Sequence, residues 1–239
     1  METPVTIKLH DFKRKAICPV LAHQGWDYYS LTEEERLFNR IFMEWYGWYS
    51  RRGCKLNLTV ADSMISRICL KEEADMDIAP KLHSAIRSYN RSSLSWTTIK
   101  DPVVNILAQI KIKNTIIDYH VPVYNKNEQR HTFLLQDQRI TNTTDLYRSY
   151  EARMIAVWSF YFLDTQPSVY NIRYLDNGEV DVMHIRCTQK YIKESKIIFS
   201  NLEHLLYNRK YLPPNEVCSG CSRRNECPTT IAQLKQKSY

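Results

Sequence analysis

The stretch Val103–Tyr124, with the sequence VVNILAQIKIKNTIIDYHVPVY, decides the fold class of this 239-residue chain. Its first part, up to Lys113, alternates through apolar residues, and its second part, from Thr115, is rich in β-branched residues with Asp118 at its centre. A period of two in hydrophobicity predicts strands with one buried face. The stretch therefore predicts two consecutive strands, the second of which carries an acidic side chain.

Further element signals lie on both sides of this pair. The segment from His131 to Ile140 predicts a third strand after a polar turn at Asn125–Arg130, and Asp176-Asn177-Gly178 predicts a tight hairpin. Helical periodicity predicts helices over about Leu31–Arg52, over most of 57–95 with a break near Pro80, over Tyr150–Leu163, and over about Thr188–Arg209. Thr32 with Glu35 predicts a capping box at the start of the first of these helices, and its aromatic stripe is expected in the core. The apolar helix 150–163 is expected to be buried, and the last helix is expected to turn Ile197 with its other apolar residues inward. This order predicts an α/β fold in which helices flank one mixed central sheet.

Composition limits the class of function. The chain has only five glycines and neither GxGxxG nor GxxxxGK[ST], which argues against a nucleotide-driven motor. A net charge of +7 with sixteen tyrosines and five tryptophans suits nucleic acid, although the same charge also suits a solvated surface. No signal peptide and no membrane-length apolar run is evident, so we expect a cytoplasmic, reducing location and no membrane partner.

Two cysteine clusters lie about 200 residues apart. Cys218, Cys221 and Cys227 form a CxxC-x5-C pattern, which supplies one thiolate fewer than a four-coordinate metal site or a cubane cluster needs. Cys18 is the best candidate for the fourth ligand, because a proline follows both it and Cys227. Cys54, Cys69 and Cys187 show no ligand spacing and are expected to be core thiols. Zinc and an iron–sulfur cluster both fit four thiolates.

These cysteines and the element order resemble the iron–sulfur branch of the PD-(D/E)XK nuclease superfamily, which includes RecB-like and AddB exonucleases and CRISPR-associated RecB-like nucleases. The opening helix that leads to Cys18-Pro19 and the closing cysteine triad carry the resemblance. It implies that Cys18, Cys218, Cys221 and Cys227 hold a [4Fe–4S] cluster, with zinc as the alternative. It also implies one nuclease-like domain over 1–239, whose ends, 1–30 and 210–239, form the cysteine-cluster subdomain.

The active-site pattern of that superfamily is only partly present. Asp118, in Asn114-Thr115-Ile116-Ile117-Asp118, aligns with the first acid, but the following acid-x-lysine motif reads Gln136-Asp137-Gln138. An uncharged amide is a weak ligand for a hard cation and cannot act as an acid or base near neutral pH. Strand alternation would point Asp137 away from the site unless a bulge shifts the register. The family's helical Q-x-x-x-Y motif is also missing, and His83 is a weak match for its upstream histidine.

The resemblance therefore implies a nucleic-acid-binding accessory or assembly protein with a catalytically silent nuclease-like fold, rather than an enzyme. One alternative is an active metal-dependent DNA exonuclease that uses Asp118 and Asp137 with Mg²⁺ or Mn²⁺. A second alternative is a zinc-stapled interaction protein of a different fold. We expect nucleic acid as partner, with DNA favoured, and a larger nucleoprotein or viral complex as a further partner. The candidate phosphate contacts are Lys13, Arg14, Lys15, Arg223 and Arg224.

Overall fold

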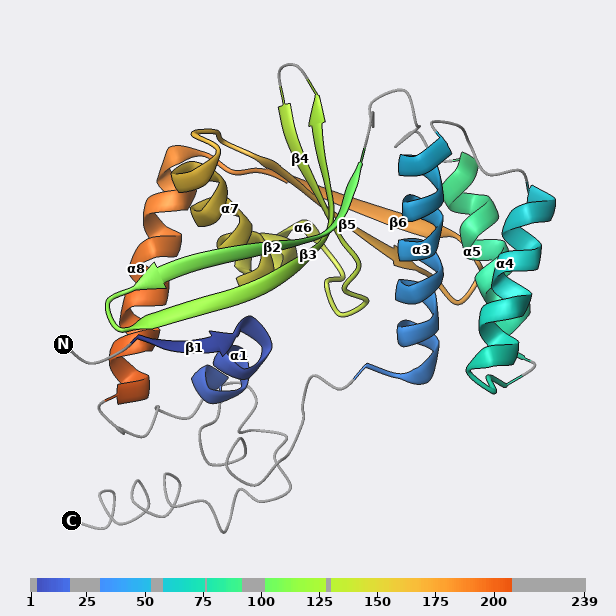
Figure 1. Ribbon diagram of the computed structural model, residues 1–239, viewed down its shortest axis with the longest axis horizontal. Coiled ribbons are helices and arrows are strands. Elements are labelled where there is room, and N and C mark those ends of the chain that lie inside the picture. The colour runs from blue at the N-terminus through green and yellow to red at the C-terminus, as the bar shows by residue number, and fades with distance from the viewer. Residues whose placement is uncertain are drawn as a thin grey trace, which may run out of the picture. The chain divides into compact units, whose positions relative to one another are not determined.

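The computed structural model describes residues 4–17, 31–52, 58–75, 77–91, 102–127 and 130–207 (Figure 1). Six strands in these ranges form one sheet in the order β1-β3-β4-β5-β6, with β2 (Val103–Ile112) also paired to β3. The strand bounds are Val5–Lys8 for β1, Thr115–Asn127 for β3, Arg130–Leu135 for β4, Ser168–Tyr174 for β5 and Val180–Arg186 for β6. Two of the pairings are parallel (β1 with β3, β4 with β5) and two are antiparallel (β3 with β4, β5 with β6). The predicted α/β class with a mixed sheet is confirmed.

The chain forms two compact units. The described part of the first unit contains β1, α1 (Leu9–Ile17), the segment 111–118 and residues 196–207 of α8 (Gln189–Tyr207). Phe12 of α1 and Phe199 of α8 are fully buried, and their ring centroids lie 5.8 Å apart. The helix expected before Cys18 is thus present and packs on α8, whereas the short strand β1 was not predicted.

A buried carboxylate organises the turn between β2 and β3 in this first unit. Glu203 of α8 accepts hydrogen bonds from the backbone N–H of Asn114 (3.1 Å) and from Thr115 Oγ1 (3.4 Å), and its other oxygen lies 3.8 Å from Lys113 Nζ. The carboxylate therefore satisfies polar groups of the turn that would otherwise be buried without a partner.

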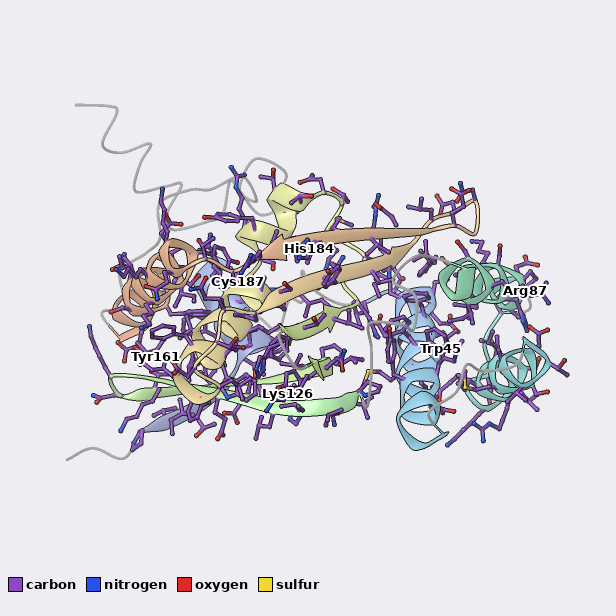
Figure 2. The ribbon with its side chains drawn as sticks, turned by 90° about the horizontal axis from the view of Figure 1, so that it is seen from above. Trp45, Arg87, Lys126, Tyr161, His184 and Cys187 are labelled. Carbon is purple, nitrogen blue, oxygen red and sulfur yellow. The ribbon has the colours of Figure 1, made fainter. Side chains whose placement is uncertain are left out.

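The second unit contains the helices α3 (Glu33–Arg52), α4 (Leu58–Lys71) and α5 (Ile78–Arg91), which stand together near the turn of the β5–β6 hairpin (Figure 1). The aromatic stripe of α3 is core, as predicted. Its fully buried members pack with apolar residues of α4 and α5 and with Leu134 and Ile172 of the sheet. They are Phe38, Phe42, Trp45 and Tyr46. Trp45 is labelled in Figure 2.

The start of α3 follows its sequence signal. The backbone N–H of Thr32 donates to Glu35 Oε2 (2.7 Å), and the backbone N–H of Glu35 donates to Thr32 Oγ1 (3.2 Å). This is the predicted capping box. The predicted break near Pro80 is present, and the interruption lies between Lys71 and Ile78, just before this proline. Pro80 occupies the first turn of α5, where its missing N–H removes no helical hydrogen bond.

Two strand boundaries also differ from expectation. Residues Asn125–Asn127 continue β3, and Asn125 is buried opposite Thr132, so the turn is shorter than the predicted Asn125–Arg130. The strand expected to reach Ile140 ends at Leu135. After this strand, the backbone of Asp137 bonds to the side chain of Asn171 in β5, and the backbone N–H of Arg139 bonds to the Asp137 side chain.

A buried helix follows this loop. The unpredicted short helix α6 (Thr143–Arg148) leads to α7 (Tyr150–Phe162), and the Ser149 hydroxyl caps α7 by accepting from the N–H of Ala152. α7 is buried on most sides, as its apolar sequence predicted. The β5–β6 hairpin is also confirmed. Its Gly178 has a φ of +79°, a backbone conformation that favours glycine.

The structure describes two groups of residues that were predicted to be buried, the apolar face of α8 and the core cysteines. The buried side chains of α8 follow Tyr191, Ser195 and Phe199, so Ile197, predicted to face inward, is 60% exposed on the other side. Cys69 and Cys187 are free and buried, which confirms them as core thiols, and burial raises the pKa of Cys187 to about 12. Cys54 lies outside the described residues. None of the described helices combines the length and the apolarity needed to cross a membrane.

Candidate functional site

The predicted site residues fall into three groups. Cys18, Cys218, Cys221, Cys227, Arg223 and Arg224 lie outside the described residues. Arg14 and Lys15 belong to α1, but their side chains are outside the described part. Lys13 is 6% exposed, and this burial leaves little of its side chain for contact with a phosphate.

The third group consists of the candidate nuclease residues. Asp118 is a half-buried residue of β3, opposite Lys8 in the parallel pairing with β1, and belongs to the first unit. Gln136, Asp137 and Gln138 follow β4 directly and belong to the second unit. Because the strand ends before them, the expectation that alternation points Asp137 away from its neighbours does not apply.

The Asp137 carboxylate is engaged by Arg139. Arg139 Nε donates to Oδ1 (2.7 Å), Arg139 Nη2 donates to Oδ2 (2.8 Å), and the backbone N–H of Arg139 also donates to Oδ1 (3.0 Å). Two parallel N–H···O bonds are the fork geometry in which arginine binds carboxylates most strongly. Both oxygens of Asp137 therefore already have a cationic partner.

The charges around this pair favour the ionised guanidinium. Burial alone would lower the pKa of Arg139, but the hydrogen bonds to Asp137 and its negative charge, assisted by Glu151 and Glu35, raise that pKa above its ordinary value. Tyr119 lies within the electrostatic influence of the same acids. Burial first, and then the charges of Glu151 and Asp137, raise the pKa of Tyr119 well above its ordinary value, so the phenol stays neutral at physiological pH.

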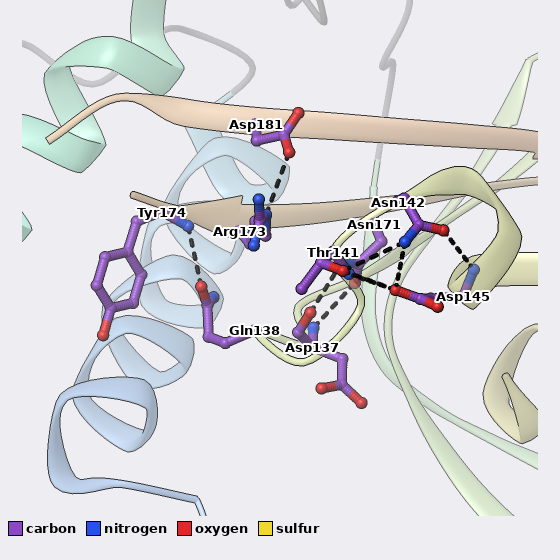
Figure 3. A network of polar contacts seen from close by, with 9 residues as sticks. All are labelled: Asp137, Gln138, Thr141, Asn142, Asp145, Asn171, Arg173, Tyr174 and Asp181. Atoms are coloured by element: carbon purple, nitrogen blue, oxygen red, sulfur yellow. Dashed lines mark hydrogen bonds and ion pairs between the residues drawn. The ribbon is translucent and has the colours of Figure 1, made fainter. Parts of the chain in front are cut away.

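Asn171 of β5 fixes the backbone of Asp137. Its Oδ1 accepts from the Asp137 N–H and its Nδ2 donates to the Asp137 carbonyl, both at 2.9 Å (Figure 3). The Asn171 side chain is fully buried. A buried amide that satisfies both the donor and the acceptor of one residue replaces the sheet ladder that stops at Leu135.

The two glutamines have structural surroundings. Gln138 Oε1 accepts from the backbone N–H of Tyr174, the last residue of β5 (3.0 Å, Figure 3). Gln136 is 6% exposed. Within the part of the chain that the structure describes, the Nε2 atoms of both glutamines lack a hydrogen-bond partner. Gln136 is therefore a buried amide, and Gln138 is a half-buried amide whose carbonyl oxygen holds the backbone of Tyr174.

The rest of the loop is pinned by a second carboxylate. Asp145 Oδ2 accepts from Thr141 Oγ1 (2.7 Å) and from Asn142 Nδ2 (2.8 Å), and Asn142 Oδ1 accepts from the Asp145 N–H (2.9 Å) (Figure 3). The loop from Gln136 to Asp145 is thus tied to β5 at one end and to the start of α6 at the other. The carboxylates of both Asp137 and Asp145 in this loop accept hydrogen bonds from neighbouring side chains.

Metal-binding capacity can be judged for the described ranges only. They contain no group of three or more His, Cys, Asp or Glu side chains that could hold a metal ion. His83, the weak match for an upstream histidine, lies 2.6 Å (Nδ1) from Asp62 Oδ1 in a contact between α5 and α4. It is therefore engaged in helix packing.

Sequence reasoning missed three residues of this loop environment. Arg139 stands two residues after Asp137, a spacing that resembles the acid-x-cation motif shifted by one position, and this signal was available. Glu151 stands in the first turn of α7, near the position at which the resembled family would carry its helical Q-x-x-x-Y motif. Asn171 is 34 residues away in β5, and no local pattern indicates its bond to Asp137.

Comparisons with known proteins bear on the fold. No family model and no curated protein matches the chain. A solved structure from Eubacterium rectale, described as a "Putative exonuclease", covers 96% of this chain and 92% of its own, with a TM-score of 0.60 and 9% sequence identity. A structure of SSO0001 covers 92% and 95% at a TM-score of 0.36 and 10% identity, too low to support an argument. The first likeness concerns the fold alone and agrees with a nuclease-like fold.

Proposed function

We propose that this protein is a nucleic-acid-binding accessory or assembly protein whose nuclease-like fold is catalytically silent. The observation that supports silence best is the Asp137–Arg139 pair, in which the guanidinium occupies both oxygens of the acid nearest the expected motif. Mg²⁺ and Mn²⁺ bind through carboxylate oxygens, and a bidentate arginine competes for those atoms. The neighbouring Gln138 uses its carbonyl oxygen to hold Tyr174.

Charge supports nucleic acid as the partner. The chain has 33 Lys and Arg against 26 Asp and Glu, which gives the net charge of +7. Exposed cations in the described part include Lys81, Arg87, Lys126 and Arg186. A basic protein gains affinity for phosphates by releasing counterions, without reading sequence. We therefore propose that the protein binds the phosphate backbone of nucleic acid, with DNA favoured, and that it does so within a larger nucleoprotein or viral complex.

The four cysteines belong to the same proposal. Four thiolates suit either a [4Fe–4S] cluster or zinc, and we propose the iron–sulfur cluster as a structural staple. Support comes from the packing of Phe12 on Phe199, because α1 ends at Ile17, directly before Cys18 in the sequence, and α8 ends at Tyr207, before the cysteine triad in the sequence. When bound, the group would supply folding free energy by joining the two ends of the chain.

The test of silence is a cleavage assay. End-labelled single- and double-stranded DNA is incubated with the protein and Mg²⁺ or Mn²⁺, and we expect no product. Metal-dependent cleavage that disappears in Asp118→Ala would overturn the proposal in favour of the exonuclease alternative. Arg139 occupies both carboxylate oxygens of Asp137, so a variant meant to restore a metal site must also remove this arginine. The triple variant Gln136→Glu, Gln138→Lys and Arg139→Ala meets that condition.

Binding is measured separately by fluorescence anisotropy of labelled DNA across a salt series. We expect the logarithm of the affinity to fall linearly with the logarithm of the salt concentration, as phosphate contacts require. Failure to bind single or double strands at low salt would reject nucleic acid as the partner. An assembly role would then be the remaining part of the proposal.

A further inference from the structure

One face of the β3–β4 hairpin carries aromatic and basic side chains in register. Tyr124 lies opposite Phe133 and Lys126 lies opposite His131 in the antiparallel pairing, and residues two apart on a strand share a face. The Tyr124 ring stacks on Phe133 (centroids 4.8 Å apart) and on His131 (5.8 Å). Tyr124 Oη also lies 2.8 Å from His131 Nδ1. Along this face, exposure to solvent therefore increases from the buried pair Tyr124 and Phe133 to the exposed Lys126 near the turn.

The same aromatic contacts continue onto α7. Phe133 packs edge-on against Trp158 (6.1 Å), and Trp158 stacks on Phe162 (6.2 Å), the last residue of the helix. Phe162 is 64% exposed, and its neighbour Tyr161 is 61% exposed. We call Lys126, His131, Tyr124, Phe133, Trp158, Phe162 and Tyr161 the aromatic strip. Lys126 and Tyr161 are labelled in Figure 2.

The strip has a rigid base and two exposed ends. Phe133 is fully buried and Tyr124 nearly so, and together they support the half-buried rings of His131 and Trp158. Burial and the charge of Lys126 lower the pKa of His131, so its imidazole is neutral near pH 7 and offers an uncharged ring face. Phe162 and Tyr161 instead present large apolar rings to solvent, where they gain little from folding.

We propose that the aromatic strip binds a short run of single-stranded nucleic acid, with bases stacked on Phe162 and Tyr161 and a phosphate held by Lys126. The proposal rests on the proposed function and names the class of ligand. The strip presents exposed rings at one end and a cation at the other, which match the two parts of a nucleotide chain, because every base has a π-face and every phosphate a negative charge. Bases inside a duplex are stacked on one another and leave no free face for these rings.

The test compares matched oligonucleotides. Binding of a fluorescein-labelled oligo(dT) and of a duplex of the same length is followed by anisotropy with the full-length protein. We expect Phe162→Ala to weaken oligo(dT) binding at least about five-fold and to leave duplex binding unchanged. Phe162→Trp should preserve the affinity, whereas Phe162→Leu, which keeps an apolar side chain without a ring, should lose it. Leu70→Ala, at an 83% exposed apolar position on α4, should have no effect.

The cation has its own readout. Lys126→Gln should lower the slope of log affinity against log salt for oligo(dT) by about 0.7, the value for one single-strand phosphate. Lys71→Gln, at an exposed cation of α4, should leave the slope unchanged. If the protein binds nucleic acid in a salt-dependent manner but Phe162→Ala and Lys126→Gln bind like the parent, the aromatic strip is not the binding site. The proposed function would still stand. If neither oligo(dT) nor duplex binds at low salt, both are wrong.

If Phe162→Ala leaves oligo(dT) binding intact but abolishes self-association in light scattering, the strip is a protein interface. That outcome also overturns the proposal.

Discussion

At the scale of single residues, Asn171 is the side chain on which the loop after β4 depends most. It satisfies both backbone groups of Asp137 from a fully buried position. Asn171→Ala leaves the Asp137 N–H without its partner and removes one of two donors to the Asp137 carbonyl, which keeps its bond from the Ile140 N–H. We therefore expect unfolding to become easier by about 1–3 kcal/mol. Urea denaturation measures the change, with Asn201→Ala at an exposed position of α8 as control. Equal midpoints for Asn171→Ala and the parent protein would contradict this role.

Asp62 gives a residue-level prediction about pH. Burial would raise its pKa, but hydrogen bonds from His83 and Arg87 outweigh burial and lower the pKa below the ordinary 3.8. The folded state then binds protons less readily than the unfolded state, so Asp62 stabilises the fold above about pH 4 and this contribution is lost as pH falls through the lowered pKa. Because Asp62 is about one-third exposed, the effect should stay below about 1 kcal/mol.

The corresponding measurement is a series of urea titrations from pH 7 to pH 3. Asp62→Asn should be less stable than the parent at pH 7, and the two should converge at the acid end. Asp164→Asn is the control, because Asp164 is exposed and asparagine tolerates its positive φ of 48°. A difference that does not narrow between pH 7 and pH 3 would mean that packing, and not the charge of Asp62, distinguishes the two proteins.

At the scale of elements, the two described glycines with known surroundings predict opposite effects. A Cβ on Gly178 in the β5–β6 turn would lie 2.2 Å from Ser84 Oγ, and its φ of +79° strains any other residue. A Cβ on Gly47 inside α3 would meet nothing within 4 Å. We expect Gly178→Ala to lower the melting temperature and Gly47→Ala to raise it. Alanine has the higher helix propensity, which should add about 0.5–1 kcal/mol to the free energy of unfolding of Gly47→Ala. Shifts in the same direction for both variants would contradict this account.

Element positions were largely predictable, and their ends were not. Strong periodicity located α3, α7, α8 and the β5–β6 hairpin, and the Thr32–Glu35 box marked the start of α3 because capping is local chemistry. The end of β4 could not be found from its apolar run, since the side chain that releases Gln136–Gln138 from the ladder is Asn171, in another strand. β1 is only four residues long, and the strand is defined by its pairing with β3 rather than by its own pattern.

The candidate site was predictable to the same extent. Its residue types followed from aligning Asp118 and Gln136–Gln138 with a motif, and the amides alone predicted a loss of acid–base chemistry. The sequence did not predict that Arg139 occupies the Asp137 carboxylate, because this contact depends on the turn after β4. In that turn the backbone N–H of Arg139 also donates to Asp137 Oδ1. On a continuous strand the two side chains would share a face, but this backbone bond would be missing. The position of the Asp137 backbone therefore depends on the long-range bonds to Asn171, whereas its carboxylate is occupied by the local contact with Arg139.

At the scale of the whole molecule, the remaining prediction concerns what joins the two ends of the chain. The described helices α1 and α8 meet through Phe12 and Phe199, and the sequence places one cysteine just beyond the first and three beyond the second. Four thiolates at one place would bind metal strongly, and a bound metal or cluster that constrains both ends stabilises the folded state. The size of the separation in sequence makes the stabilisation large, because a long loop is closed.

We expect protein purified without oxygen to be brown, with broad visible absorbance from thiolate-to-iron charge transfer and about four iron atoms per chain. Replacing Cys18, Cys218, Cys221 or Cys227 with serine should remove the colour and lower the melting temperature. Cys69→Ser should keep the iron, because Cys69 is a buried thiol of α4 within the apolar core. Colourless protein with one zinc per chain would favour the zinc alternative. Loss of iron in Cys69→Ser but not in Cys18→Ser would reject the ligand set itself.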